Sequence, residues 1–508
     1  MGRRSGALAV MAGLTGLALA THLPQLWGVP AFGVEWEEVA IAYRIAFEHL
    51  RPATDYGKDI GPLFNYIVAA GFRLVGPSLL LPRLITLAAG VLTVPVTYLI
   101  GREAYDEATG KIAAVMLAFS GAGIFLSHEA FSDALTPLAV ALAGLATLLA
   151  DRRGSLWLIP AGFLWAMALE SDSSVLAILV PLAVYLAWMA RRRPMATLAG
   201  VGAFVLGYAH MILLNIRQPL ISLNWILERK GYAVGQSHTL VQIALNYLEE
   251  ALGWGQTLAS SFPVPLSLIW VDALGLVFVI VWLDLFARAV WAKRGDGSSR
   301  LLLVLSVGPL LVIPLVNQAY LYPQMSRYLV PVLPFALILA ARYGREVLAS
   351  ISAPHRRLAL AAATTMAVIW PAFSLTAYEG AQVQTRGGNA QALTLIERSR
   401  TLAGANGQVY LDSTGYRARW LRIGLLSDGL RPITVGDPWA RGLRGVFLPS
   451  EWRRILAGSS SPRLVLLSRL SFLRLRSDIP PAAGLSSVGG PGGGYVIVRL
   501  PARRGAGG

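Results

Sequence analysis

The chain of 508 residues contains no cysteine and few charged residues. Without cysteine, disulfide bridges and thiolate metal sites are excluded, and the redox compartment is left open. Only 14% of the residues are charged and 55% are hydrophobic, whereas about a quarter of the residues of a soluble domain are charged. So much apolar surface requires lipid as its solvent. The composition therefore predicts a multi-pass protein of the cell membrane.

The formal net charge of +16 does not indicate a nucleic-acid-binding protein. Lys and Arg stand mainly in short clusters between apolar stretches and in the C-terminal segment, a distribution typical of membrane topology. We therefore expect a lipid bilayer as partner and no nucleic acid.

Apolar stretches that can cross a bilayer recur through the first 376 residues. One crossing needs about 20 apolar residues, and the sequence predicts roughly eleven spans. They lie near 7–28, 80–100, 112–127, 134–150, 155–169, 174–190, 195–214, 264–286, 301–317, 328–343 and 358–376. The first resembles a signal peptide, but Thr21 to Gly33 lacks a small-x-small cleavage pattern, so we interpret it as a retained helix.

The distribution of basic residues predicts the orientation of these spans. Lys and Arg crowd into the segments that share a side with the N-terminus, such as Arg152-Arg153 and Arg191 to Arg193, which predicts a cytoplasmic N-terminus. Two long loops, 29–79 and 215–263, are then expected on the outer side. We expect residues 1–376 to form an α-helical polytopic membrane domain.

A change of composition follows the last predicted span. Residues 377–508 contain many glycines, β-like runs at 408–412, 464–467 and 495–500, and a helical stretch at 389–402. We expect 377–508 to form a small soluble α/β domain on the extracytoplasmic side.

Three carboxylates stand within four residues at the start of the first outer loop, as Glu35-Trp36-Glu37-Glu38. Like charges this close repel one another and lose solvation near a membrane. Some of them are therefore expected to contact a cation, a hydroxyl or a basic side chain. The alternative is a solvated loop edge beside an interfacial tryptophan.

Lys58 and Asp59 lie further along the same loop, between Gly57 and Pro62. A lysine beside a glycine can approach a phosphate as a point charge. Pro62 interrupts helical structure, which favours a re-entrant turn. Taken alone, this motif is weak.

The predicted third and fourth spans are joined by His128, Glu129 and Asp133. An ionisable residue at the edge of an apolar span is a functional candidate, because burying it unpaired is costly. Asp133 also fits the N-cap of the following helix. For His128 we favour a structural or hydrogen-bonding role over metal ligation, since no histidine is suitably spaced near it.

Arg327 and Tyr328 mark the outer end of the tenth predicted span. The guanidinium fork of an arginine offers paired donors to a phosphate or a carboxylate. Interfacial anchoring is the alternative role of Arg327.

In this order and placement, the segments resemble the GT-C superfamily of membrane glycosyltransferases, especially the protein O-mannosyltransferase-like branch (family 39) and the lipid A aminoarabinose transferases. The resemblance covers roughly residues 7–345, and no single motif carries it. Besides the acidic first loop, it includes Lys-x-x-x-Pro-Leu from Lys58, Arg-Leu-x-x-Leu-x-x-Gly from Arg83, and Arg-Tyr-x-x-Pro-x-x-Pro from Arg327. The family's first-loop pair, usually Asp-Glu after an aromatic residue, is matched by Trp36-Glu37-Glu38, with Glu in place of Asp.

The resemblance implies a glycosyltransferase that moves a sugar from a polyprenyl-phosphate-linked donor to a protein, lipid or glycan acceptor on the extracytoplasmic side. Glu37, with Glu35 as the second choice, would act as general base or orient the acceptor, supported by Asp133. Lys58 and Arg327 would hold the carrier phosphate. Further substrate-binding candidates are Glu38, Asp59, His128, Glu129 and Tyr328. Some relatives use a divalent cation, and the acidic loop permits Mg²⁺ or Mn²⁺ without requiring either.

A transporter or flippase of lipid-linked saccharides is the main alternative, because such proteins also gather charged residues near membrane cavities. Against it, the sequence shows no paired halves with matching interrupted spans. A non-catalytic scaffold would not need the four motifs to converge. The sequence leaves open the sugar, the acceptor and the oligomeric state.

Overall fold

The computed structural model describes residues 2–24, 26–27, 33–52, 61–219, 222, 240–258, 279–284, 287–288, 297–316, 326–361, 364–365, 369, 389–404, 407–414, 418–435, 448–457, 462–488 and 494–501. Lys58 and Asp59 lie outside the described residues, as does most of the predicted spans 264–286 and 358–376. Arg327 belongs to a described helix, but its side chain is outside the described part.

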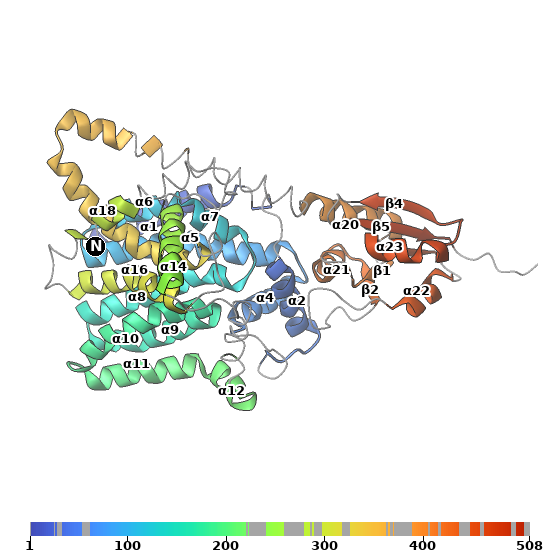
Figure 1. Cartoon of the computed structure of the whole chain (residues 1–508), viewed down its shortest axis with the longest axis horizontal. Helices are drawn as coiled ribbons and strands as arrows, with labels where there is room; N and C mark the ends of the chain where they lie inside the picture. Colours follow the sequence, from blue (N-terminus) through green and yellow to red (C-terminus); the bar gives the residue numbers. More distant parts are fainter. Residues whose placement is uncertain are drawn as a thin grey trace, which may run out of the picture.

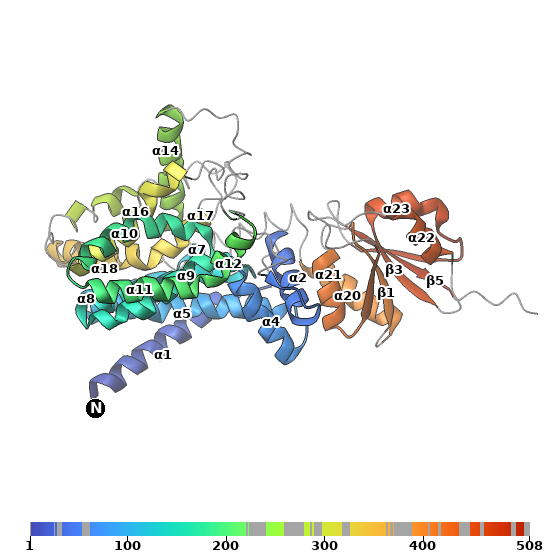
Figure 2. The ribbon, with the colours of Figure 1, turned by 90° about the horizontal axis from the view of Figure 1, so that it is seen from below.

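Long helices of the first 350 residues pack side by side into a bundle that follows the long axis of the molecule (Figures 1 and 2). Its first half comprises α1 (Gly2–His22), α2 (Gly33–Phe47), α4 (Leu63–Val75), α5 (Leu80–Ala104), α6 (Glu107–Ala118), α7 (Gly121–His128), η1 (Ser132–Leu135) and α8 (Thr136–Arg152). The second half comprises η2 (Ser155–Trp157), α9 (Leu158–Ser171), η3 (Ser173–Val175), α10 (Leu176–Ala190), α11 (Pro194–Gly207), α12 (Ala209–Arg217), α14 (Leu240–Leu258), α16 (Gly297–Val316), α17 (Ser326–Leu329), η4 (Val330–Val332) and α18 (Leu333–Ser350).

Four helical segments of the described residues are long and apolar enough to cross a membrane: Leu80–Ala104, Ser132–Arg152, Ser173–Ala190 and Gly297–Leu315. The number rises to six if two bent pairs each form one span. These pairs are α6 with α7, bent by 57°, and α11 with α12, bent by 60°. They coincide with the predicted spans 112–127 and 195–214. The total of roughly eleven spans stays a prediction, because several of them lie at least partly outside the described residues.

Small residues let neighbouring helices of the bundle approach closely. At the crossing of α5 and α6, a Cβ added to Gly101 would lie 2.7 Å from Cα of Gly110. Such contacts replace the hydrophobic driving force that is missing between helices in lipid. A larger side chain at Gly101 would therefore push the two helices apart.

The turn before α6 is fixed by Asp106, whose carboxylate accepts a hydrogen bond from the Thr109 N–H at 2.7 Å.

The C-terminal residues form a five-stranded sheet in the order β2-β1-β3-β5-β4. The strands are β1 (Gln408–Asp412), β2 (Arg431–Val435), β3 (Arg463–Ser468), β4 (Gly484–Val488) and β5 (Tyr495–Leu500). β1 pairs in parallel with β2 and β3, while β5 pairs antiparallel with β3 and β4. The helices of this region are α20 (Asn389–Ala403), α21 (Ala418–Ser427), α22 (Pro449–Leu456) and α23 (Arg469–Leu475), followed by η5 (Arg476–Asp478).

Alternating side chains of the strands bury two separate faces of this sheet. Leu464 and Leu466 of β3 join a core with Trp420 of α21, whereas Val465 joins a second core with Trp452 of α22. The first core continues into α2 and α4 of the bundle. This continuity attaches the sheet to the bundle, as Figure 2 shows.

A polar contact strengthens the same attachment. A guanidinium nitrogen of Arg422 on α21 lies 2.8 Å from the carboxylate of Glu48. The same guanidinium stands 5.2 Å from the ring centre of Tyr43 on α2. The C-terminal region is therefore held against the first loop by apolar packing and by the ion pair between Arg422 and Glu48.

The predicted helix 389–402 and the strands 408–412, 464–467 and 495–500 are confirmed within one or two residues by α20, β1, β3 and β5. β2 and β4 were not predicted. Both lie at the edges of the sheet, and the side chains of β4 are mostly exposed. An exposed edge strand has no apolar run by which a sequence reveals it.

Candidate functional site

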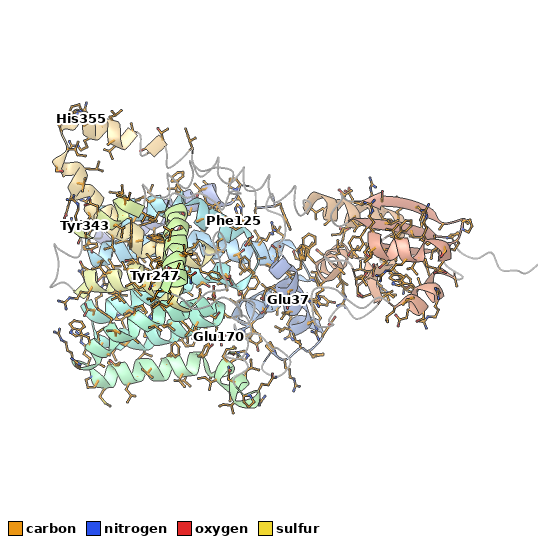
Figure 3. All side chains as sticks on the ribbon, viewed as in Figure 1. Glu37, Phe125, Glu170, Tyr247, Tyr343 and His355 are labelled. Atoms are coloured by element: carbon orange, nitrogen blue, oxygen red, sulfur yellow. The ribbon has the colours of Figure 1, made fainter. Side chains whose placement is uncertain are left out.

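The bundle has two ends that differ in their ionisable residues. We call the end that faces the C-terminal sheet the domain-side end, and the opposite end the far end. Glu37 and Glu170 lie at the domain-side end, whereas Tyr343 and His355 lie at the far end (Figure 3). Glu35 and Glu38 lie on the same first turns of α2 as Glu37, and the Ala130 N–H of the α7–α8 junction lies 3.4 Å from the Glu35 carboxylate, so these described residues share the domain-side end.

A buried ion pair joins α2 to α5 at this end. Nε of Arg83 donates to Oε1 of Glu35 at 3.0 Å, and Nη2 donates to Oε2 at 3.0 Å. Both side chains are fully buried. The contact is bidentate, which fixes orientation as well as distance.

Arg83 also connects this pair to the end of α1. Its Nη1 donates to the carbonyl of Leu26 at 2.6 Å, and its guanidinium stands 5.1 Å from the ring centre of Trp27. The Ala130 N–H also donates to Oε2 of Glu35, at 3.4 Å. One arginine therefore holds together three segments that are far apart in the sequence.

The first turns of α2 divide its three carboxylates between two sides. Successive residues of a helix are about 100° apart, so Glu35 and Glu38 share a face and Glu37 points elsewhere. Glu38 is fully buried, like Glu35, and its carboxylate accepts a hydrogen bond from Nδ2 of Asn65 on α4. Glu37 is only half-buried. Two of the carboxylates are thus part of the packing between α2, α4 and α5, and the third is accessible.

The junction of α7 and α8 is also buried. Nε2 of His128 contacts the carbonyl of His22 at 2.5 Å, which is a structural hydrogen bond. Glu129 is 5% exposed. Asp133 is half-buried and accepts a hydrogen bond from the Ser132 hydroxyl at 3.4 Å. The contact between Glu35 and Ala130 brings this junction against the first turn of α2.

The segment that carries Arg327 packs against the same junction. α17 contacts α7, and η4 contacts α8. Tyr328 is buried at 7% exposure. The structure thereby brings Tyr328 and the backbone of Arg327 to the α7–α8 junction, while it describes neither the side chain of Arg327 nor Lys58 and Asp59.

Three ionisable residues at the domain-side end were not among the predicted site residues, although Arg83 begins one of the motifs that carry the GT-C resemblance. Besides Arg83, these are Glu170 at the end of α9 and His210 on α12, whose side chains lie 3.4 Å apart. Gly61 packs so closely on Glu170 that a Cβ added there would lie 2.8 Å from the Glu170 side chain. The signal was available, because Arg83 and Glu170 both lie in apolar stretches where charge is costly.

Glu250 on α14 is a further buried carboxyl that the sequence analysis missed. It is 2% exposed, and neither of its oxygens has a hydrogen-bond partner among the described residues. α14 packs on α17, next to Arg327. Because carboxylates are common on the polar face of an amphipathic helix, nothing in the sequence indicates that Glu250 is buried.

A metal site does not follow from the described residues. Within them, no group of three or more His, Asp or Glu side chains is placed to hold an ion. Among the described carboxylates, Glu35 and Glu38 are engaged by Arg83 and Asn65, and Glu37 and Asp133 are half-buried. These residues do not fit a protein-made cage for Mg²⁺ or Mn²⁺, so we derive no step through a metal.

The fold is similar to that of known GT-C membrane glycosyltransferases. The structure matches ArnT from Cupriavidus metallidurans, bound to undecaprenyl phosphate, with a TM-score of 0.63 and 14% identity over 96% of this chain and 97% of that one. It also matches the oligosaccharyltransferase of Archaeoglobus fulgidus, tethered with an acceptor peptide, with a TM-score of 0.51 and 15% identity over 84% of this chain and 64% of that one.

Sequence comparison gives a narrower result. Residues 59–213 match the family model described as dolichyl-phosphate-mannose-protein mannosyltransferase. No curated relative matches the sequence at a significant level. The resemblance to GT-C glycosyltransferases is thus confirmed by this family match and by the fold of nearly the whole chain.

Proposed function

We propose that this protein is a membrane glycosyltransferase that uses a polyprenyl-phosphate-linked sugar as donor. The fold shared with ArnT along nearly the whole chain supports this proposal, together with the family match over residues 59–213. The observation that carries it is the division of the α2 carboxylates: Glu35 and Glu38 are fixed in the packing, and Glu37 is left accessible.

In the proposed reaction, an acceptor hydroxyl or amine attacks the anomeric carbon of the sugar, and the bond to the carrier phosphate breaks. Glu37 accepts the proton of the nucleophile or orients it. Asp133 supports the acceptor or the sugar by hydrogen bonding. Lys58 and Arg327 stabilise the charge that develops on the leaving phosphate.

The rigid surroundings of Glu37 are part of this proposal. A general base must reach its proton within hydrogen-bonding distance, so small shifts of its helix are costly. The bidentate Arg83–Glu35 pair fixes the first turn of α2. Glu35, named above as the second choice for the base, therefore receives a positioning role.

Transfer of radiolabelled sugar from a polyprenyl-phosphate donor tests the proposal. We expect Glu37→Gln to lower transfer about 10²-fold to 10⁴-fold while the protein stays folded. A matched control is Glu397→Gln, which alters an exposed carboxylate on α20. Full transfer by Glu37→Gln would disprove the assignment of the base, and uptake of a lipid-linked saccharide without transfer would support a transporter.

We further propose that residues 1–376 form the membrane domain with a cytoplasmic N-terminus, and that 377–508 form an extracytoplasmic domain near the site of transfer. The natural absence of cysteine makes this testable by single-cysteine labelling. One variant is Arg398→Cys, at an exposed position of α20, and the other is Lys111→Cys, at an exposed position of the far end. In intact cells, an impermeant maleimide is expected to label only the first variant, and the reverse result would invert the topology.

A further inference from the structure

A small polar cavity lies inside the bundle, where the ends of α1 and α7 meet the middle of α5. It offers about 20 Å³ of room to the centre of a water molecule. Its polar lining residues are His22, Thr93 and Ser127, and all its other lining residues are apolar side chains or glycines. Every one of them belongs to the described part of the chain. A cavity of this size with polar walls holds water, whereas an apolar cavity stays dry.

The side chain of His22 has an open hydrogen-bonding position at this cavity. His22 is the last residue of α1 and is 2% exposed. Its Nδ1 lies 3.1 Å from Oγ of Ser127, and its backbone carbonyl accepts from Nε2 of His128 at 2.5 Å. Nε2 of His22 has no hydrogen-bond partner among the described residues. Since buried polar atoms of native proteins are paired with protein or with ordered water, this nitrogen points to a ligand.

The hydrogen bonds of Ser127 decide which nitrogen of His22 carries the proton. The Ser127 hydroxyl donates to the carbonyl of Ile124 at 2.6 Å, so its single proton is used. Oγ of Ser127 can then only accept, which makes Nδ1 of His22 the donor and leaves Nε2 a bare acceptor in the neutral ring. The ligand of the cavity must therefore donate a hydrogen bond to Nε2.

Thr93 offers a second acceptor on the wall of the cavity. Its hydroxyl donates to the carbonyl of Ala89 at 2.8 Å, so its oxygen is left to accept. One water has two protons, which suit Nε2 of His22 and Oγ1 of Thr93. An anion without a proton suits neither atom, and none of the described residues that line the cavity is a carboxylate that could balance a metal ion. A larger donor does not fit, because a single water already needs roughly 10–15 Å³ of such room.

Gly90 of α5 holds the walls of the cavity together. A Cβ added at Gly90 would lie 2.6 Å from Cβ of Ser127 and 3.2 Å from Nδ1 of His22. One turn earlier on the same helix, the Thr86 hydroxyl donates to the carbonyl of Ser127 at 3.0 Å. Both contacts fix the ends of α1 and α7 against α5, so the positions of the two acceptors are built into the helix crossing.

We propose that this cavity is the binding site of one ordered water molecule, which donates to Nε2 of His22 and to Oγ1 of Thr93. The water links the end of α1 to α5, and through His22 it links both helices to α7. It completes the polar network behind the α7–α8 junction, which contacts Glu35. The site and its ligand do not depend on the proposed reaction.

A double-mutant cycle on the full chain in detergent tests the bridge. Thr93→Val keeps the shape of the side chain and removes one acceptor of the water, and His22→Phe removes the other. No hydrogen bond joins Nε2 of His22 to Thr93 directly. Because one water serves both residues, we expect the melting temperature of the double variant to fall by at least about 2 °C less than the sum of the two single falls.

Thr97→Val is the matched control for this cycle. Thr97 lies one turn further along α5, is fully buried and donates to the carbonyl of Thr93 at 2.8 Å, but it does not line the cavity. Its effect on the melting temperature is expected to add to that of His22→Phe. Thr93→Ser keeps the hydroxyl and should retain the coupling. Additive effects of Thr93→Val and His22→Phe would refute the bridging water.

A density map of the full chain that resolves ordered water tests the site directly. In the natural protein we expect a peak about 2.7–3.2 Å from Nε2 of His22, with Oγ1 of Thr93 as its second neighbour. The peak should weaken in Thr93→Val and persist in Thr97→Val, a comparison that does not require His22→Phe to fold. A natural protein without the peak would refute the site, and a peak about 2.0–2.1 Å from Nε2 would assign a metal ion instead. None of these measurements uses transfer, so the site stands or falls apart from the proposed function.

Discussion

The two ends of the bundle use charged residues in different ways. At the far end, Arg153 pairs with Glu103 and Lys111 with Glu107, and their side chains are largely exposed, except for Glu103. At the domain-side end, Arg83 and Glu35 pair with no exposure. Exposed pairs contribute little to stability, whereas burying a pair costs desolvation that apolar residues would avoid.

The ion pairs at the two ends therefore differ in their burial and in what their loss would do to the free energy of unfolding. The far-end pairs lie on the surface of the bundle, where their net contribution to stability is small. A buried ion pair is weak evidence for stability, so we look for what else the Arg83–Glu35 contact does. The contact fixes the first turn of α2, on which Glu37 also lies.

The largest effect is expected from breaking the buried pair on one side only. Arg83→Met leaves the Glu35 carboxylate in an apolar site, so we expect a loss of about 3–5 kcal/mol in the free energy of unfolding. Thermal unfolding followed by tryptophan fluorescence measures this loss.

A double variant sharpens the same experiment. Arg83→Met with Glu35→Met removes both charges and is expected to recover most of the stability, while transfer stays low because α2 is no longer held by a bidentate contact. Equal stability of Arg83→Met and the natural protein would mean that the pair does not differ from those at the far end.

The contact between Asn65 and Glu38 is expected to give the next largest effect. Asn65→Leu removes a donor to a buried carboxylate, which costs about 1–3 kcal/mol. Chemical denaturation in detergent measures this cost, with Asn215→Leu on the half-buried side of α12 as control. A loss no larger than that of the control would contradict the structural role of Glu38.

At the far end, a substitution of Asp106 is expected to have an effect of intermediate size on stability. Asp106→Ala removes the N-cap of α6 and the 2.7 Å contact with Arg345, with an expected loss of about 1 kcal/mol. Partial burial alone would raise the pKa of Asp106, but the Thr109 N–H and the Arg345 guanidinium outweigh it and hold the pKa below its usual value.

The sign of the pH dependence follows from this lowered pKa. The stabilisation by Asp106 is present above the unfolded pKa of about 4 and is lost as the pH falls through the lower folded value. Melting temperatures of the natural protein and of Asp106→Ala should therefore differ at neutral pH and converge below about pH 4. A difference in melting temperature that stays constant at acid pH would contradict a contribution of the Asp106 charge to stability.

The smallest effect is expected from Lys111→Gln at the far end. The pair with Glu107 is exposed on both sides, so its loss should change stability by less than about 0.5 kcal/mol. Salt at high concentration should remove even this difference. A loss comparable to that of Arg83→Met would erase the distinction between the ends.

Several elements were predictable because their signal is local. The apolar stretch of α5 and the alternating strands β1, β3 and β5 follow from periodicity alone. The bends between α6 and α7 and between α11 and α12 were not predicted, since both halves are apolar and the hydropathy of the chain does not record a change of direction.

The candidate site was predictable in its residue types but not in their roles. Glu35, Glu37 and Glu38 were singled out by their density of charge, which is visible in the sequence. Which of them are buried depends on Arg83 and Asn65, which lie 48 and 27 residues away from Glu35 and Glu38 in the sequence. Nothing in the local sequence predicts these two contacts. Helical phase alone predicts that Glu37 differs from its neighbours, but not which side is buried.

By itself the sequence determined that this protein needs a membrane, that its charges gather at the ends of apolar helices and that an acidic turn begins the first loop. Those properties follow from solvation and from local periodicity, which act on neighbouring residues. Only the tertiary structure decided that Arg83 holds Glu35, that Glu37 remains accessible and that His22 and Thr93 line one cavity. Contacts between distant segments depend on how helices cross, and no local rule fixes that.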